Sequence, residues 1–219
     1  MGKILVIGAG GQLGTELTKV LAEKYGNELI IATDFQESAR SKFGYCNFQT
    51  LNVLDKVELE NIVKKDGVTQ IYHLAAILSA AGEKNPIQAW DLNMGGLLNV
   101  LEIARAYSIE KVFWPSSIAV FGPSSEKERT PQNAFKDPNT IYGISKLSGE
   151  HWCEYYFNKY GVDVRSVRYP GLIGYKSLPG GGTTDYAVDI YHKAMSGTKF
   201  SCFLSELETI LRLNFSKST

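Results

Sequence analysis

The chain has 219 residues, of which 44% are hydrophobic and 21% charged, the composition of an ordinary globular protein of about one domain. Its 23 lysines and arginines balance 23 aspartates and glutamates, so no basic excess indicates nucleic acid or an anionic membrane as a partner. The apolar run Ile4–Ile7 is too short for a signal peptide or a membrane span. The three cysteines are scattered and odd in number, which predicts a reduced, cytoplasmic protein without a metal site.

Short apolar runs alternate with amphipathic stretches through the first 170 residues. The pattern predicts strands at 3–7, 28–32, 48–51, 70–75, 111–116 and 162–169. It predicts helices at 12–25, 55–65, 86–107 and 141–160, and a long loop at 123–139, where Pro, Ser and Asn are frequent. Such alternation predicts parallel strands with helices on both faces, an α/β doubly wound sheet.

A glycine-rich turn joins the first predicted strand to the first predicted helix. Glycines there let the backbone approach a pyrophosphate, whose charge the helix N-terminus favours. Asp34 ends the second strand roughly 20 residues after Gly14, where a carboxylate would accept hydrogen bonds from the adenosine ribose hydroxyls and repel a 2′-phosphate. A tight turn with a capped helix is the alternative. The pattern predicts an NAD site with contacts from Gly8, Gly11, Gln12, Leu13, Gly14 and Asp34.

A tyrosine and a lysine stand four residues apart on the last predicted helix. Tyr142 and Lys146 therefore share a face, and an ammonium near a phenol lowers the pKa of that phenol. Such a phenol can take a proton from a substrate alcohol while hydride leaves its carbon. Two hydroxyls, Ser116 and Ser117, end the fifth strand, at the edge where sites gather in a parallel sheet. An exposed Tyr/Lys pair and a serine turn are the alternatives.

The spacing of Gly8, Gly11 and Gly14, with the run Tyr142-Gly143-Ile144-Ser145-Lys146, resembles the extended short-chain dehydrogenase/reductase family. The resemblance implies an NAD-binding Rossmann fold in which Ser117, from its spacing to Tyr142, is catalytic together with Tyr142 and Lys146. Further cofactor contacts are implied, although core packing or a turn explains each residue equally well when it is read alone. They would come from Asn52, Val53, Leu74, Ala75, Ala76, Asn93, Tyr142, Lys146, Tyr169, Pro170 and Ile173.

Two later segments narrow this resemblance. Residues 168–173 read R-Y-P-G-L-I, and residues 181–187 read G-G-T-T-D-Y-A. Over residues 1 to about 204 the chain resembles the short-chain, UDP-galactose 4-epimerase-like L-threonine 3-dehydrogenases. This implies oxidation of L-threonine at its 3-hydroxyl, giving 2-amino-3-oxobutanoate and NADH. The alternative interpretation of residues 180–184 is a flexible loop. Substrate contacts would come from Ser79, Ser116, Ser117, Tyr142 and Thr184.

The chain departs from that family's pattern after about residue 205. We expect an NAD-binding domain at 1–170, followed by a substrate loop and an incomplete, truncated or altered C-terminal substrate region at 171–219. The resemblance also implies a homodimer formed through the helices at 86–107 and 141–160. A nucleotide-sugar epimerase or dehydratase, and a catalytically impaired NAD-binding protein, remain alternatives.

Overall fold

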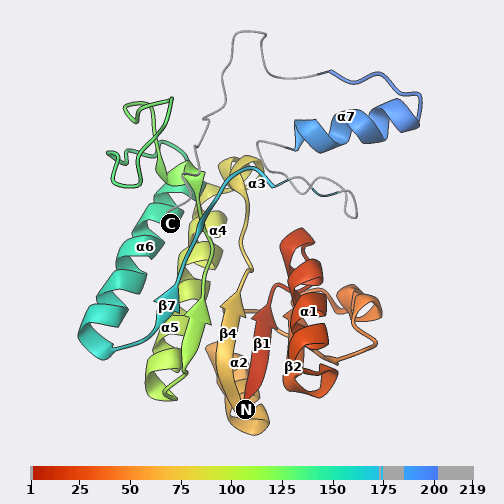
Figure 1. Ribbon diagram of the computed structural model, residues 1–219, viewed down its shortest axis with the longest axis vertical. Helices are drawn as coiled ribbons and strands as arrows, with labels where there is room; N and C mark the ends of the chain where they lie inside the picture. The colour runs from red at the N-terminus through yellow and green to blue at the C-terminus, as the bar shows by residue number, and fades with distance from the viewer. Residues whose placement is uncertain (1, 173, 175–184, 202–219) are drawn as a thin grey trace.

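The computed structural model describes residues 2–172, 174 and 185–201, and its centre is a six-stranded, wholly parallel sheet (Figure 1). The strand order is β3-β2-β1-β4-β5-β7, so the order reverses beside β1. Two short parallel strands, β6 and β8, form a second sheet. The bounds are β1 (Lys3–Ile7), β2 (Ile30–Asp34), β3 (Asn47–Thr50), β4 (Val68–His73), β5 (Lys111–Phe113), β6 (Ser116–Ser117), β7 (Val164–Arg165) and β8 (Arg168–Tyr169).

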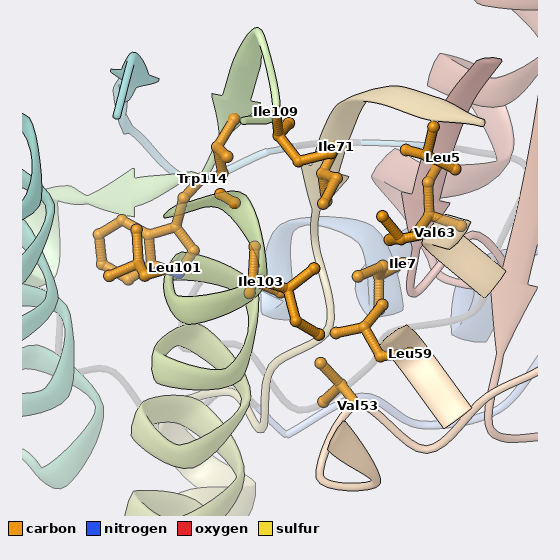
Figure 2. Close-up of a cluster of buried hydrophobic side chains, with 14 of the residues drawn as sticks. Leu5, Ile7, Val53, Leu59, Val63, Ile71, Leu101, Ile103, Ile109 and Trp114 are labelled. Atoms are coloured by element: carbon orange, nitrogen blue, oxygen red, sulfur yellow. The ribbon is translucent and has the colours of Figure 1, made fainter. Parts of the chain in front are cut away.

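Helices cover both faces of the larger sheet. Alternate residues of β1 point to opposite sides, because successive side chains of a strand do so. Leu5 and Ile7 pack in a core with α2, α5 and α6, part of which Figure 2 shows, whereas Ile4 and Val6 pack in a second core with α1. The described helices are α1 (Gln12–Tyr25), α2 (Lys56–Asp66), α3 (Ser79–Lys84), α4 (Pro86–Trp90), α5 (Gly96–Ala106), α6 (Ile141–Tyr160) and α7 (Tyr186–Met195).

The doubly wound parallel sheet is confirmed, and α1 and α6 have the predicted bounds. The second strand begins only at Ile30, because Asn27–Leu29 forms a 3₁₀ turn. The predicted strands 111–116 and 162–169 are each divided in two. Pro115 has no N–H to continue the ladder, so the chain leaves the large sheet there, and its next residues pair with β8 instead.

The predicted helix 86–107 is also divided. A π-helical turn, η3 (Asp91–Gly95), separates α4 from α5 without breaking the helical path. The short α3 and the later α7 were not predicted. Within the described residues, none of the helices is both long enough and apolar enough to cross a membrane.

Candidate active site

The glycine-rich turn lies where β1 ends, against the segment that follows β4. Gly8 has φ +81°, and a Cβ added to it would lie 2.6 Å from the backbone nitrogen of Ala75. A Cβ on Gly14 would collide with the carbonyl oxygen of Gly8. Glycine is therefore required at both positions, one for the turn and one for close packing of α1 on β1.

The start of α1 is open to an anion. Gly11 caps the helix without a side-chain hydrogen bond, and its first turn, with Gln12 and Leu13, holds no acidic residue. A Cβ on Gly11 would come no closer than 3.5 Å to a described neighbour, so the protein itself leaves free space there. Asp34 ends β2 and accepts a hydrogen bond from the Gly10 nitrogen at 2.9 Å. This arrangement fits a dinucleotide, with pyrophosphate at the helix N-terminus and ribose at the carboxylate.

The predicted adenine and phosphate contacts divide into exposed and buried groups. Asn52 is exposed just beyond β3, and its Oδ1 accepts from the Leu54 nitrogen at 3.1 Å. Val53 is buried in the core, where it packs against Gly96, so its side chain does not face the site. The half-buried segment 74–76, which contains Leu74, Ala75 and Ala76, lies at the end of β4 beside the glycine turn.

The first turn of α6 is fixed by two caps. The Thr140 hydroxyl accepts from the Gly143 nitrogen at 3.0 Å, and the Glu83 carboxylate accepts from the Ile141 nitrogen at 2.8 Å. A side chain at N-cap that satisfies these free N–H groups fixes where the helix starts. Tyr142 therefore stands in the first turn, and Lys146 follows one turn later on the same face.

Lys146 is held deep beneath the tyrosine. Its Nζ donates to the Pro115 carbonyl oxygen at 2.6 Å and lies 4.4 Å from the ring centroid of Trp114 and 5.5 Å from that of Tyr142. The approach is close because α6 has a glycine, Gly149, directly over the Trp114 ring. The lysine is thus fixed by a carbonyl and two aromatic faces.

The second sheet brings Ser117 to the same place. Ser117 lies opposite Tyr169 in the β6–β8 pair, Pro170 follows directly, and the Ser117 hydroxyl is near enough to the Tyr142 phenol to lower its pKa. The structure thus brings together the predicted trio of Ser117, Tyr142 and Lys146 at the carboxyl edge of the strands. Two predicted contacts, Ile173 and Thr184, lie outside the described residues.

Burial controls the ionisation of this group. It raises the pKa of Tyr142, and the Ser117 hydroxyl only partly opposes that rise. It lowers the pKa of Lys146, which is 3% exposed, to about 7. In the chain by itself the pKa of Tyr142 therefore moves upward, opposite to the direction expected from a neighbouring ammonium, because burial is its largest cause. His73, buried beneath the same edge, has its pKa lowered to about 3 by burial and then by Lys146, so it stays neutral.

The Ser116 hydroxyl is committed to a contact inside the protein, and its contact with a substrate remains a prediction. Ser116 is 2% exposed, and its hydroxyl donates to Oε1 of Glu150 at 2.6 Å. Arg168 donates to the two oxygens of the same carboxylate at 2.7 and 2.8 Å. Burial raises the pKa of Glu150, but the hydrogen bonds from Arg168 and Ser116 outweigh it, so that pKa lies below its usual value. Ser116 thus joins β6 to α6.

Asn93 lies in the π-helical turn and is 5% exposed. Its Oδ1 accepts from the Ile77 nitrogen at 2.8 Å, and its Nδ2 donates to the Ile77 oxygen at 3.1 Å and to Ser145 Oγ at 3.3 Å. The amide is thus committed to holding the segment after β4, and direct cofactor contact remains a prediction. Ser79 is half-buried at the start of α3.

The roles of Glu150 and Trp114 were not predicted from the sequence. The available signal for Glu150 was its position four residues after Lys146, on the same face of one helix. Glu150 and Arg168 also line a cavity of about 980 Å³ that continues along α6 to Phe157. Ser117, Tyr142 and Lys146 do not line that cavity, so it is separate from the trio.

Residues 4–201 match the NAD dependent epimerase/dehydratase family. A relative described as an uncharacterized epimerase/dehydratase of Staphylococcus saprophyticus is 48% identical over 216 residues, which cover 98% of this chain and 67% of the relative. A solved partial consensus L-threonine 3-dehydrogenase matches with TM-score 0.90 and 56% identity over 93% of this chain and 65% of the other. The GalE-like L-threonine dehydrogenase from Cupriavidus necator (holo form) matches with TM-score 0.89 and 54% identity over 93% and 66%. The chain spans about two thirds of the length of these proteins.

Proposed function

The chain belongs to the NAD-dependent epimerase/dehydratase family, and we propose that it oxidises L-threonine at the 3-hydroxyl to 2-amino-3-oxobutanoate, with formation of NADH. The observation that carries the proposal is the grouping of Ser117, Tyr142 and Lys146 at the strand edge that also holds the glycine turn. The 54–56% identity to L-threonine dehydrogenases supports the choice of substrate.

NAD is the cofactor of this family, and the residues present fit it. The open start of α1 would hold the pyrophosphate, and Asp34 would accept hydrogen bonds from the adenosine ribose. Tyr169 and Pro170 would lie toward the nicotinamide end, because β8 pairs with the strand that carries Ser117. When bound, NAD accepts the hydride from the substrate carbon, and the positive charge of its oxidised ring favours a nearby phenolate.

The trio then supplies the proton chemistry. Ser117 holds the substrate oxygen beside the phenol, and Tyr142, as phenolate, takes the hydroxyl proton. The O–H electron pair becomes the second bond of the carbonyl as the C–H pair leaves with the hydride. Lys146 favours the phenolate while it is charged, and its pKa of about 7 lets it release a proton near neutral pH. Burial of Lys146 keeps that charge out of bulk water.

Tyr142→Phe tests the mechanism. We expect threonine-dependent NADH formation to fall by about 10²-fold or more, the usual contribution of a general base, while NADH still binds. Tyr107→Phe is the matched control, because Tyr107 is an exposed tyrosine that follows α5 and its hydroxyl contacts Glu60, away from the trio and from the aromatic residues of α6. Unchanged turnover in Tyr142→Phe would refute the mechanism. Absence of turnover in the unaltered chain, with NADH still bound, would refute the activity and leave the family intact.

We also propose that two copies associate through α5 and α6. These helices lie side by side on one face of the sheet (Figure 1). The outer side of α6 carries exposed aromatic side chains, which a monomer rarely gathers in one patch; Trp152, Tyr155 and Tyr160 are between 39% and 44% exposed. A shallow hollow of about 640 Å³ lies among these aromatic residues. Burial of this patch against a second copy would remove it from water.

A further inference from the structure

A short helix beside the catalytic edge reaches the first turn of α6 with an acidic side chain. This helix is α3, and its exposed residue Glu83 accepts a hydrogen bond from the Ile141 nitrogen at 2.8 Å. The first N–H groups of a helix have no partner within it, and a carboxylate suits the positive end of the helix dipole. One cap of the catalytic helix is therefore supplied by another element, 58 residues earlier in the sequence.

The two helices also approach each other closely where this hydrogen bond forms. A Cβ added to the buried Gly82 would lie 3.2 Å from Cγ2 of Ile141 and 3.3 Å from Cβ of Ala89, so α3 fits tightly between α6 and α4. Close-packed neighbours transmit a displacement, because no free volume absorbs it. A shift of α3 would therefore be passed to Ile141 and so to its neighbour Tyr142.

The same turn of α6 is fixed on another side against the segment that carries Ser117. A Cβ added to Gly143 would lie 2.2 Å from the Ala119 carbonyl oxygen, and the Ala119 nitrogen donates to Ser117 Oγ at 3.2 Å. Tyr142 thus has the Ser117 segment against the residue that follows it and α3 against the residue that precedes it. The position of its phenol relative to Ser117 therefore depends on α3 as well.

The helix α3 carries a second feature of interest. Ser79, for which a substrate contact is predicted, is the first residue of α3, and Glu83 follows four residues later. Residues with this spacing lie on the same face of a helix. One short helix therefore carries a predicted substrate contact at its start and a cap of the catalytic helix near its end.

We propose that Glu83 is a positioning residue, which ties the placement of the Tyr142 phenol to α3 through the Ile141 nitrogen. Glu83 itself touches neither the substrate nor NAD, and it acts by holding the first turn of α6 in the position from which Tyr142 meets Ser117. The proposal rests on the proposed function for its effect on turnover. It does not rest on that function for its effect on α6, since the hydrogen bond is present in the chain alone.

Two substitutions of Glu83 separate the hydrogen bond from the side chain as a whole. Glu83→Ala removes the acceptor, whereas Glu83→Gln keeps an acceptor oxygen in a side chain of nearly the same shape. In Glu83→Ala we expect amide hydrogen exchange in residues 141–143 to be about fivefold faster, the scale of one lost hydrogen bond. The kcat of threonine-dependent NADH formation should fall by about tenfold, because a misplaced reacting group lowers the rate, while the KM for NAD changes less than twofold. Glu83→Gln should restore most of both properties.

Two controls separate positioning from a loss of stability. Lys84→Ala changes the next residue of α3, which is also exposed, and should leave both exchange in 141–143 and kcat unchanged. Asp66→Ala removes a carboxylate at the opposite edge of the sheet, where Asp66 accepts from Lys3 Nζ at 2.9 Å and from Gln49 Nε2 at 3.0 Å. This second control should lower the Tm without lowering kcat at temperatures well below the Tm.

The outcomes decide the role of Glu83 whether or not the chain is active. Unchanged kcat in Glu83→Ala would overturn the positioning role, and so would a loss of kcat in Glu83→Gln or Lys84→Ala as large as in Glu83→Ala. If the unaltered chain forms no NADH from threonine, the proposed function fails and hydrogen exchange alone decides. Faster exchange that is confined to the first turn of α6 in Glu83→Ala would then support the proposal, and unchanged exchange there would overturn it.

Discussion

Replacement of Glu150 by glutamine tests how the catalytic edge is held together. Glu150 accepts three hydrogen bonds, two from Arg168 and one from Ser116, and so joins α6 to both strands of the second sheet. Glutamine has nearly the same shape, but one of its terminal groups is an NH₂ donor that faces another donor. Arg168 would also lose its counter-charge.

The expected cost follows from burial. Loss of one partner of a fully buried ion pair costs about 3–5 kcal/mol. The Arg168 and Glu150 side chains are 14% and 19% exposed, so solvent screens part of the effect and we expect about 2–3 kcal/mol. For a chain of this length that corresponds to a Tm lower by roughly 4–12 °C.

Urea and thermal denaturation, followed by tryptophan fluorescence, measure this loss. Glu37→Gln is the matched control, because Glu37 also pairs with an arginine, Arg40, but the two side chains are 61% and 54% exposed. The control should cost far less than Glu150→Gln, because solvent screens exposed pairs. Equal losses in the two variants would refute the argument from burial. The pKa of Glu150 in the folded protein lies below its usual value, so Glu150 adds to the free energy of unfolding at pH values above its unfolded pKa. This stabilisation is lost as the pH falls through the folded pKa. The Glu150→Gln variant should not show that acid-dependent loss of stability.

Two further predictions concern Lys146 and the aromatic patch. Between pH 7 and 10.5 the unfolded chain binds more protons at Lys146 than the folded chain does, so the contribution of Lys146 to the free energy of unfolding rises with pH. Lys146→Met should remove this rise when thermal denaturation is measured over that pH range. A stability difference between the two proteins that does not change with pH would contradict the lowered pKa. Trp152→Lys should convert a dimer to a monomer in light scattering by placing a charge in the aromatic patch; an unchanged mass would exclude this interface.

The parts of the fold that could be predicted from sequence are those that depend on residues close to each other in the chain. The glycine turn, the start of α6 and the four-residue spacing of Tyr142 and Lys146 depend on neighbours in sequence, and the structure has all three as expected. The division of the fifth and sixth strands was not predicted, because it depends on which distant strand each half pairs with. Pro115 carried a local signal for that break.

The ionisation and the hydrogen bonds of the site could not be predicted from sequence either, because they too depend on residues that are distant in the sequence. Burial sets the pKa values of Tyr142 and Lys146, and burial is a property of the assembled chain. Ser116 and Ser117 are neighbours with the same side chain, yet one donates to Glu150 and the other acts on the pKa of Tyr142. Alternation along a strand predicts that they point to opposite sides, but not which side holds the site.

Asn93 explains how the cofactor half of the site is joined to the catalytic half. Ala75 packs against Gly8 in the glycine turn, and two residues later Ile77 is held at both its nitrogen and its oxygen by the Asn93 amide. The same amide donates to Ser145, whose hydroxyl donates to the Tyr142 carbonyl oxygen at 2.8 Å. A continuous path of contacts therefore runs from the turn to the first turn of α6. The π-helical turn belongs to this path, because Asn93 lies within it and its buried amide bonds both Ile77 and Ser145.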